Sequence, residues 1–417
     1  MSSLNVSFVG LGYIGLPTAV VMANSGVNVV GVDVNAVNVE KINRGEITIV
    51  EPGLQEELTA ALESGRFRAT TEQVHSDAYI IAVPTPFTDN YDVDMKYIYS
   101  AAEAIAPQLV GDELIVLEST SPPQTTAKMA QRILECRPDL VADGAENPDN
   151  KPVIYFAHCP ERILPGYAME ELRTNDRIIG GQTAEATRRA TAIYATFCKG
   201  ELLATNDVTA EMTKLTENSF RDVNIAFANE LSLICDKLGI DVWELINLAN
   251  HHPRVNILQP GPGVGGHCIA VDPWFIVAAD PENSKLIHTA RKVNDGKPGW
   301  VINKVKDAVS KTDAKKVAVL GLAFKPDIDD LRESPALNIA VDLAEELESK
   351  TILAVEPNVS ELPKRLKGFD NVELKEYKEA IATSEVVVLL VDHKEFREFD
   401  ASGLENKVLV DTKGLWK

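Results

Sequence analysis

Short runs of apolar residues alternate along the chain with longer segments in which apolar residues recur at helical spacing. In the first part of the chain the apolar runs occupy residues 5–10, 28–33, 77–83, 113–120 and 153–161. Helical patterns such as residues 16–26 and 95–109 lie between them. Strands that alternate with helices are typical of a mainly parallel sheet. Ligands of such sheets bind beyond the carboxyl ends of the strands.

The middle of the chain is helical and its last part returns to strands. The stretch from 210 to 239 has no proline and predicts one long helix, and helical patterns also cover 241–252 and 285–311. Further apolar runs occupy residues 315–324, 351–357, 385–392 and 407–414. The pattern predicts an α/β protein with two Rossmann-like, doubly wound domains joined by a central helical domain. The predicted domains are 1–205, 206–305 and 306–417.

Composition and charge narrow the class of protein. The 417 residues are 45% hydrophobic and 25% charged, as in ordinary globular proteins. A net charge of −21 argues against nucleic acid and anionic membranes as main partners, because both demand a basic footprint. The 5 cysteines are scattered without a CxxC pair, and no run of 18 apolar residues occurs. Together with an N-terminus that does not resemble a leader, these features predict a cytoplasmic protein.

The first predicted strand leads into a glycine-rich turn, Gly10-Leu-Gly12-Tyr-Ile-Gly15, which opens a helix. In a dinucleotide-binding turn the first glycine makes the turn, the second lets a pyrophosphate approach, and the third lets helix and strand pack. Asp33 ends the next strand, where a carboxylate accepts hydrogen bonds from ribose hydroxyls and repels a 2′-phosphate. The combination predicts a site for NAD rather than NADP.

A second glycine-rich stretch, QPGPGVGGHCIAVDPW, begins at residue 259 and contains Cys268 and, four residues on, Asp272. Its glycines allow the backbone to lie close to a bound molecule, which would place the thiol to react. The alternative is a plain turn with a small buried cysteine.

Polar residues elsewhere are further candidates. Thr120 and Glu161 are the last residues of predicted strands. They either lie near a nicotinamide or substrate or are simply cap and turn residues. Lys214, Asn218 and Asp222 recur every four residues and share one helix face, which either is solvated or lines a cleft.

Three histidines and an arginine surround the cysteine stretch. His251, His252 and His267 lack a further ligand at a recognisable spacing, so we predict no metal site. Arg254 is either an anion contact or a surface charge.

The first turn of the last domain, residues 321–325, lacks GxGxxG, so no second NAD is expected there. Lys325 and Arg332 lie near a predicted helix start at Ser334 and could bind another nucleotide. A duplicated domain with only a structural role is the alternative.

Motifs along nearly the whole chain resemble the UDP-glucose/GDP-mannose dehydrogenase family of nucleotide-sugar 6-dehydrogenases. They are VGLGYIGLP, PTP, EST, CPER, KLTENSFRDVNIAFANE, GPGVGGHC and GLAFKPDIDDLRESP. The resemblance implies that two NAD⁺ oxidise a primary alcohol at sugar C6 to a carboxylate, through a thiohemiacetal and a thioester on Cys268. The cysteine stretch is most similar to members that act on UDP-N-acetyl-D-mannosamine for surface polysaccharides. UDP-N-acetylglucosamine and UDP-glucose are the alternative substrates.

The resemblance also implies roles for single residues. Lys214 and Asn218 would stabilise negative charge on the substrate oxygen, while Asp272, Glu161 and Thr120 would handle protons and position water. The family often has a second glutamate where this chain has Pro165. The implied cofactor contacts are Gly10, Gly12, Tyr13, Ile14, Gly15, Asp33, Pro84, Thr85, Thr120 and Arg332. The implied substrate contacts are Glu161, Arg162, Lys214, Asn218, Arg254, Gly265 and Lys325.

Family members dimerise through the central helices, and the matching arginine reaches the partner's substrate. A homodimer with Arg254 in this role is therefore expected. Two other classes of function stay open at this point. A one-step alcohol or hydroxyacid dehydrogenase needs no cysteine and would yield one NADH per substrate. A protein that binds NAD and a UDP-sugar without turnover would yield none.

Overall fold

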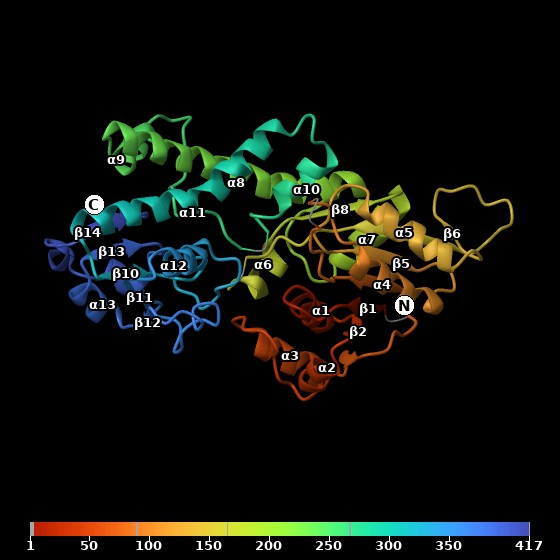
Figure 1. The fold of residues 1–417 in the computed structure, drawn as a ribbon. Helices are drawn as coiled ribbons and strands as arrows, with labels where there is room; N and C mark the ends of the chain where they lie inside the picture. Colours follow the sequence, from red (N-terminus) through yellow and green to blue (C-terminus); the bar gives the residue numbers. More distant parts are fainter. Residues whose placement is uncertain (1–3, 89–90, 165, 267, 417) are drawn as a thin grey trace. The chain divides into compact units, whose positions relative to one another are not determined.

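The computed structural model describes residues 4–88, 91–164, 166–266 and 268–416 (Figure 1). The chain divides into two compact units, Met1–Thr216 and Glu217–Lys417. The first unit and the last part of the second contain strands that alternate with helices, and the start of the second unit is helical, as the sequence predicts. The α/β class is therefore confirmed.

The first unit contains a mainly parallel sheet with the strand order β3-β2-β1-β4-β5-β7-β8-β9, and β6 pairs with β7. Val6 of β1 lies opposite Val29 of β2 and Ala78 of β4, so central strands pair apolar residues on both sides. The β7–β8 pair is antiparallel. The strands are β1 (Asn5–Val9), β2 (Asn28–Val32), β3 (Phe67–Thr70), β4 (Ala78–Ile81), β5 (Leu114–Leu117), β6 (Val141–Ala142), β7 (Val153–His158), β8 (Arg177–Gly181) and β9 (Leu202–Asn206).

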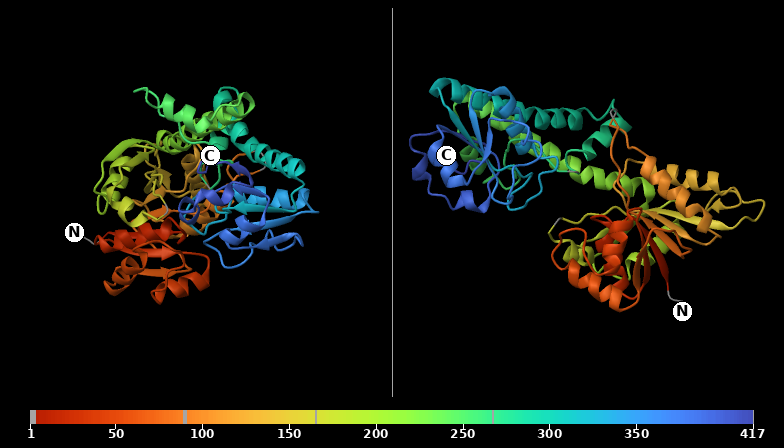
Figure 2. Two further views of the ribbon diagram at one scale, coloured as in Figure 1. Left: turned by 90° about the vertical axis from the view of Figure 1, so that its left-hand side faces the viewer. Right: turned by 60° about the horizontal axis from the view of Figure 1, so that its bottom comes forward.

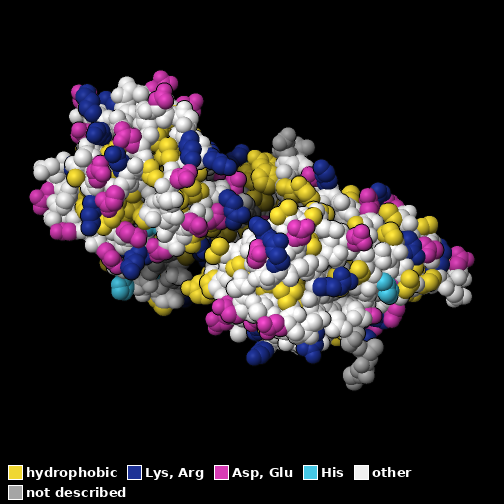
Figure 3. All heavy atoms as spheres, turned by 90° about the horizontal axis from the view of Figure 1, so that it is seen from below, with side chains coloured by type: hydrophobic (Ala, Val, Ile, Leu, Met, Phe, Trp, Pro, Cys, Tyr) yellow, Lys and Arg dark blue, Asp and Glu magenta, His cyan; other side chains and the backbone are white. Residues whose placement is uncertain are grey.

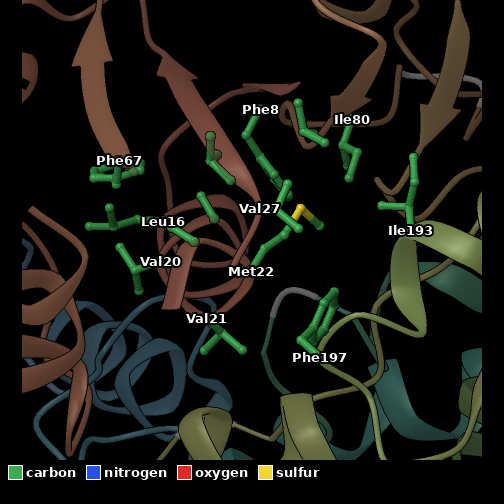
Figure 4. Close-up of a cluster of buried hydrophobic side chains, with 14 of the residues drawn as sticks. Phe8, Leu16, Val20, Val21, Met22, Val27, Phe67, Ile80, Ile193 and Phe197 are labelled. Carbon is green, nitrogen blue, oxygen red and sulfur yellow. The ribbon is translucent and has the colours of Figure 1, made fainter. Parts of the chain in front are cut away.

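Helices cover both faces of this sheet. On one face Phe8, Val20 and Phe197 belong to a buried cluster (Figure 4), and on the other Ile115 packs with residues of α4 and α5. The helices are α1 (Gly15–Asn24), α2 (Ala36–Asn43), α3 (Leu54–Glu63), α4 (Lys96–Ile105), η1 (Ala106–Gln108), α5 (Thr125–Cys136), α6 (Ala168–Thr174) and α7 (Ala184–Tyr194). The two faces are thus each buried by their own helices.

The long helix α8 (Asp207–Leu238) begins in the first unit and continues into the second, close to its predicted bounds. It ends before Gly239, whose φ of 70° is the left-handed conformation that commonly terminates helices. Three more helices follow: α9 (Val242–Ala249), α10 (Asp272–Ala279) and α11 (Lys285–Thr312). In the second unit α11 runs beside α8 (Figure 2).

The second unit also contains a parallel sheet, with the order β12-β11-β10-β13-β14. Helices α11 and α12 contribute to the buried cluster on one face, and α13 and α14 to that on the other. The strands are β10 (Lys316–Leu320), β11 (Thr351–Val355), β12 (Val372–Leu374), β13 (Val386–Leu389) and β14 (Val408–Asp411). The remaining helices are α12 (Pro335–Glu346), α13 (Tyr377–Thr383), α14 (Lys394–Arg397) and η2 (Ala401–Leu404).

Surface charge is mixed despite the net negative balance. On the face drawn in Figure 3, Asp and Glu side chains are interspersed with Lys and Arg. A small anionic ligand therefore responds to the charges around its own site more than to the net charge of the chain. Among the described residues, none of the helices combines the length and the apolar character that crossing a bilayer requires.

Candidate active site

The glycines of the first turn have different surroundings. Gly10 has a φ of 98°, and a Cβ there would lie 2.4 Å from the Ala82 carbonyl oxygen. A Cβ at Gly15, the first residue of α1, would lie 1.8 Å from the Gly10 carbonyl oxygen. At Gly12 a Cβ would meet nothing within 4 Å. The fold thus requires Gly10 and Gly15, whereas Gly12 leaves room for a pyrophosphate at the start of α1.

A carboxylate is fixed beside this turn. Asp33 Oδ2 accepts a hydrogen bond from the Leu11 N–H at 2.9 Å, and Oδ1 accepts one from the Asn35 N–H at 2.8 Å. The Asp33 side chain is only partly buried, so it can also accept hydrogen bonds from a ribose. Tyr13, within the turn, donates its hydroxyl hydrogen to the Glu51 carboxylate. The residues of this edge therefore fit NAD.

The segments after β4 and β5 are tied to each other at the carboxyl edge of the sheet. The Thr85 hydroxyl donates to the Thr120 carbonyl oxygen at 2.7 Å, and the Ser119 hydroxyl donates to the Val83 carbonyl oxygen at 2.7 Å. Pro84, between Val83 and Thr85 in the sequence, is exposed. The structure thus brings together three residues that the sequence suggests for the cofactor site.

Glu161 belongs to a buried group of charges that sequence reasoning missed. Its Oε2 accepts from Arg177 Nη2 at 2.7 Å, and its Oε1 accepts from the Arg162 N–H at 2.6 Å. Glu118 lies near the other terminal nitrogen of the same guanidinium, with 3.5 Å between Glu118 Oε1 and Arg177 Nη1. Burial, followed by the negative charge of Glu161, raises the pKa of Glu118 to about 8 against the attraction of Arg177. Glu118 is therefore mostly neutral at pH 7, which leaves Arg177 to pair with Glu161.

Three polar residues on α8 have separate surroundings. Lys214 and Asn218 are partly buried, and Asn218 Nδ2 donates to Asp272 Oδ2 at 2.5 Å. Asp222 is fully buried and forms an ion pair with Arg291 of α11. Burial raises the pKa of Asp222 to about 6, and the nearby Arg291 opposes that rise. This helix face is therefore not a solvated stripe, and Asp222 links two helices.

Cys268 is exposed at the end of the glycine stretch. Its carbonyl oxygen accepts hydrogen bonds from the Val271 N–H at 3.0 Å and the Asp272 N–H at 2.8 Å. These bonds form the turn that leads into α10, where the Asp272 side chain is buried. The thiol therefore lies one turn before a carboxylate that is held by Asn218.

The glycines before Cys268 allow close packing against the start of α12. A Cβ at Gly265 would lie 2.5 Å from both the Glu333 carbonyl oxygen and Pro335 Cδ. The Gly266 N–H donates to the same Glu333 oxygen at 3.3 Å. Within the second unit, the cysteine stretch thus lies against the loop that also carries Lys325.

That loop is anchored at a strained residue. Asp327 has a φ of 62°, and its carboxylate accepts from Arg397 at 2.6 Å and from the Lys394 N–H at 2.7 Å. Lys325 is partly buried two residues earlier. Arg332 is exposed and forms an ion pair with Asp330 at 2.7 Å. The anchoring restricts where Lys325 can reach.

The histidine and arginine candidates lie at the surface of the second unit. His251, His252 and Arg254 are exposed, and His267 lies outside the described residues. Within the part of the chain that the structure describes, His, Cys, Asp and Glu form no group suited to a metal ion. The candidates thus form two sets, one around the turn and strand ends of the first unit and one around Cys268 in the second.

Family models cover nearly the entire chain. The NAD-binding domain of the UDP-glucose/GDP-mannose dehydrogenase family matches residues 4–198, its central domain 208–296 and its UDP-binding domain 318–417. The chain belongs to this family. It is accordingly an NAD-dependent dehydrogenase of nucleotide sugars. The resemblance seen in the sequence motifs is confirmed.

Similar proteins share the full length of the chain. A UDP-N-acetyl-D-mannosamine dehydrogenase of Yersinia pestis is 55% identical over 100% of both chains. An NDP-N-acetyl-D-galactosaminuronic acid dehydrogenase of Ralstonia nicotianae is 53% identical over 99% of this chain and 96% of the relative. Among solved structures, the UDP-N-acetyl-mannosamine dehydrogenase of Staphylococcus aureus superposes with a TM-score of 0.85 at 43% identity, covering 99% of this chain and 96% of that one.

Proposed function

We propose that this enzyme oxidises UDP-N-acetyl-D-mannosamine at C6 to the uronate in two hydride transfers, which are linked by a thiohemiacetal and a thioester on Cys268. The relatives at 54–55% identity support the choice of sugar, and the exposed Cys268, one turn before an Asp272 that Asn218 holds, supports the chemistry. The product would supply an aminouronic acid for surface polysaccharides. The proposed domains remain 1–205, 206–305 and 306–417.

The thiol gives the two oxidations a covalent link. NAD⁺, when bound, accepts the hydride that the sugar loses in each step. Between the steps the Cys268 thiolate adds to the C6 aldehyde and forms a thiohemiacetal. This covalent bond prevents the aldehyde from leaving the enzyme. After the second hydride leaves, water cleaves the resulting thioester to the carboxylate and the thiol. A thiol with a pKa of about 8.5 is mostly protonated at neutral pH, so nearby cationic and hydrogen-bonding groups must favour its thiolate.

Other polar residues would supply charge stabilisation and proton transfer. Lys214 and Asn218, one helical turn apart on α8, are suited to donate hydrogen bonds to a developing oxyanion. Asp272, held by Asn218, would accept or return a proton. Glu161, which forms an ion pair with Arg177, would activate the water that cleaves the thioester, with Thr120 positioning that water.

Each unit contains residues that we propose for binding. In the first, Gly10, Gly12, Gly15 and Asp33 would hold NAD, together with Tyr13, Ile14, Pro84, Thr85 and Thr120. Arg332 would lie near the cofactor. In the second, Gly265 and Lys325 would contact the UDP-sugar, which Arg162 and Glu161 would also reach. The cationic groups suit the diphosphate.

The decisive test is the yield of NADH with a panel of UDP-sugars. With UDP-N-acetyl-D-mannosamine we expect two NADH for each sugar consumed and no released aldehyde, and much slower turnover of the glucosamine, galactosamine and glucose analogues. The galactosamine analogue is essential because a relative named for that sugar is 53% identical. One NADH per sugar would instead identify a one-step dehydrogenase. Binding without NADH would identify a non-catalytic protein.

A matched pair of cysteine variants tests the covalent step. Cys268→Ser is expected to abolish production of the uronate while the protein stays folded. Cys136→Ser changes another exposed cysteine and should leave turnover intact. Two NADH per sugar at the normal rate from Cys268→Ser would refute the role of the thiol.

We also infer a homodimer that forms through α8. Phe220, Phe227 and Ile234 recur every seven residues on this helix and are 70%, 54% and 46% exposed. Large apolar side chains at this spacing form one stripe, which a second copy of the helix would cover. Arg254, exposed after α9, would reach the substrate of the partner.

The five cysteines form no disulfide, which supports a cytoplasmic location.

Light scattering after size exclusion tests the dimer. The unmodified chain should have the mass of a dimer, and Phe227→Asp should shift it toward a monomer, because a charge in the middle of an apolar interface is costly. Val37→Asp, at a residue of α2 that is 60% exposed, is the control and should stay dimeric. A dimer that survives Phe227→Asp would contradict the assignment of this face.

A further inference from the structure

Buried amides connect α8, α11 and the cysteine loop, which we define as residues 259–271. The Gly261 N–H donates to Asn229 Oδ1 at 2.9 Å, and Asn229 Nδ2 donates to Asn294 Oδ1 at 2.8 Å. Both asparagine side chains are almost completely buried. Each atom of the Asn229 amide is therefore engaged, with the oxygen toward the loop and the nitrogen toward α11.

The same chain of hydrogen bonds returns to the loop on the other side of Cys268. Asn294 Nδ2 donates to Asp222 Oδ1 at 2.8 Å, and the Arg291 guanidinium pairs with that same oxygen. Arg291 Nη1 also faces the Ile269 carbonyl oxygen at 3.5 Å, which is the longest link of the chain. Arg291 and Asp222 are fully buried. The loop is thus tethered seven residues before the thiol and one residue after it.

A glycine-rich loop needs such external tethers. Gly263 and Gly266 have φ values of 153° and 90°, and glycine has more backbone freedom to lose than any other residue. Attack on a carbonyl carbon demands that the thiol be held close to its reacting geometry. Buried hydrogen bonds to rigid helices restrict the loop without occupying the space around the thiol.

We propose that Asn229 and Arg291 are positioning residues that hold Cys268 in its reactive place through this hydrogen-bonded chain. The catalytic consequence rests on the proposed function of Cys268, whereas the tether itself does not. The described contacts of Asn229 and Arg291 with the loop are to its backbone, at Gly261 and Ile269. Their effect on turnover is therefore expected in kcat rather than in the KM for NAD.

The alternative is that buried polar contacts merely join α8 to α11, and the chain offers a matched control for it. Ser232, three residues after Asn229 on α8, accepts a hydrogen bond from Lys297 of α11 and is also buried. This pair joins the same two helices, but the described contacts of Ser232 do not include the cysteine loop. Asn229→Ala and Ser232→Ala each remove one buried polar side chain from one helix.

Hydrogen exchange of the full-length variants, followed peptide by peptide, tests the tether without turnover. In Asn229→Ala, amides of the cysteine loop should exchange at least about fivefold faster, because a buried hydrogen bond to the loop is lost. We expect kcat to fall about 10-fold to 100-fold, with the KM for NAD within about twofold. Ser232→Ala should leave loop exchange and kcat within about twofold.

Arg291→Lys gives a second variant at the other end of the chain, in case Asn229→Ala does not fold. Lysine keeps the charge beside Asp222 but cannot form the same planar fork, so loop exchange should again accelerate. Unchanged loop exchange in both variants would overturn the proposal, and so would equal acceleration in Ser232→Ala. If no UDP-sugar is turned over by the unmodified enzyme, the proposed function fails, while the exchange measurement still decides the tether.

Discussion

Two glycines of the first turn allow the role of the fold to be separated from the role of the ligand. A Cβ at Gly12 would meet no protein atom within 4 Å, whereas a Cβ at Gly15 would lie 1.8 Å from the Gly10 carbonyl oxygen. Neither residue has a positive φ, so alanine suits the backbone at both positions. The two substitutions differ only in what the added methyl group contacts.

The structure sets the expected magnitudes. Gly12→Ala adds no clash and restricts the unfolded chain, so the free energy of unfolding should stay the same or rise by about 0.4–1 kcal/mol. If NAD lies against this residue, the methyl group overpacks the complex by about 1–3 kcal/mol, which weakens NAD binding about 5-fold to 150-fold. Gly15→Ala forces α1 away from the turn and should cost the folded state at least about 1–3 kcal/mol. For a unit of this size that lowers the Tm by about 2–4 °C per kcal/mol.

Thermal unfolding without ligand and calorimetric titration with NAD measure the two effects separately. We expect Gly12→Ala to keep its Tm and lose NAD affinity, and Gly15→Ala to lose Tm even without NAD. Unchanged NAD affinity in Gly12→Ala would refute the placement of the pyrophosphate at this turn. A large drop in the Tm of Gly12→Ala would show that the residue has a structural role instead.

Two more predictions concern stability. Because burial and Glu161 raise the pKa of Glu118 from 4.5 to about 8, its stabilising contribution is complete below about pH 4.5 and is lost as the pH rises toward 8. In the unmodified protein the free energy of unfolding should therefore fall between about pH 5 and 8, and Glu118→Gln should make this fall smaller in urea titrations. An unchanged dependence of the unfolding free energy on pH in Glu118→Gln would contradict the raised pKa of Glu118. Gly265→Ala should destabilise the protein by about 1–3 kcal/mol, since its Cβ would lie 2.5 Å from the Glu333 oxygen. Its control, Gly296→Ala inside α11, should stabilise the protein by about 0.5–1 kcal/mol. Thermal unfolding measures both variants, and equal changes in their stability would be inconsistent with a clash at Gly265.

Local patterns in the sequence predict much of the fold. The long helix is predicted at 210–239 and observed at Asp207–Leu238, because a proline-free helical pattern followed by glycine is a local signal. The short strands β8 and β9 were not predicted. Their assignment depends on pairing with β7 and with each other, which no local pattern encodes.

Some residues of the candidate site can be recognised from a local stretch of sequence, whereas others depend on contacts between residues far apart in the chain. Cys268 and Asp272 stand out because they share one glycine-rich stretch. Glu118 lies within 3.5 Å of Arg177, which is 59 residues away in the sequence, and Asp222 pairs with Arg291, which is 69 residues away. Each of these acidic residues sits in an ordinary strand or helix pattern, and only the fold shows which cation it meets. A candidate reactive residue can thus be proposed from a local pattern, whereas the ion-pair partners of buried acidic residues cannot.

The first strand–turn segment is similar in the two sheets, but the carboxylate beside the turn is partly exposed in one and buried in the other. Gly10 follows β1 and Gly321 follows β10, both with positive φ, and the next strand of each sheet ends beside a carboxylate. Asp33 accepts one N–H from its turn and stays partly exposed. Glu356 accepts two N–H groups from its turn, at 2.8 and 3.0 Å, contacts His393 at 3.0 Å and is only 3% exposed.

This difference decides how each turn can meet an anion. In the second unit the chain's own Glu356 occupies the turn amides, so a phosphate would have to displace a buried carboxylate to use them. A diphosphate bound in that unit must therefore be met by side chains, and Lys325 is placed on the loop that directly follows the turn. In the first unit Asp33 leaves the helix start open, and the backbone itself can bind the pyrophosphate. The same arrangement of strand, turn and carboxylate thus leaves the helix start open to an anion in the first unit, whereas in the second unit Glu356 occupies the turn amides.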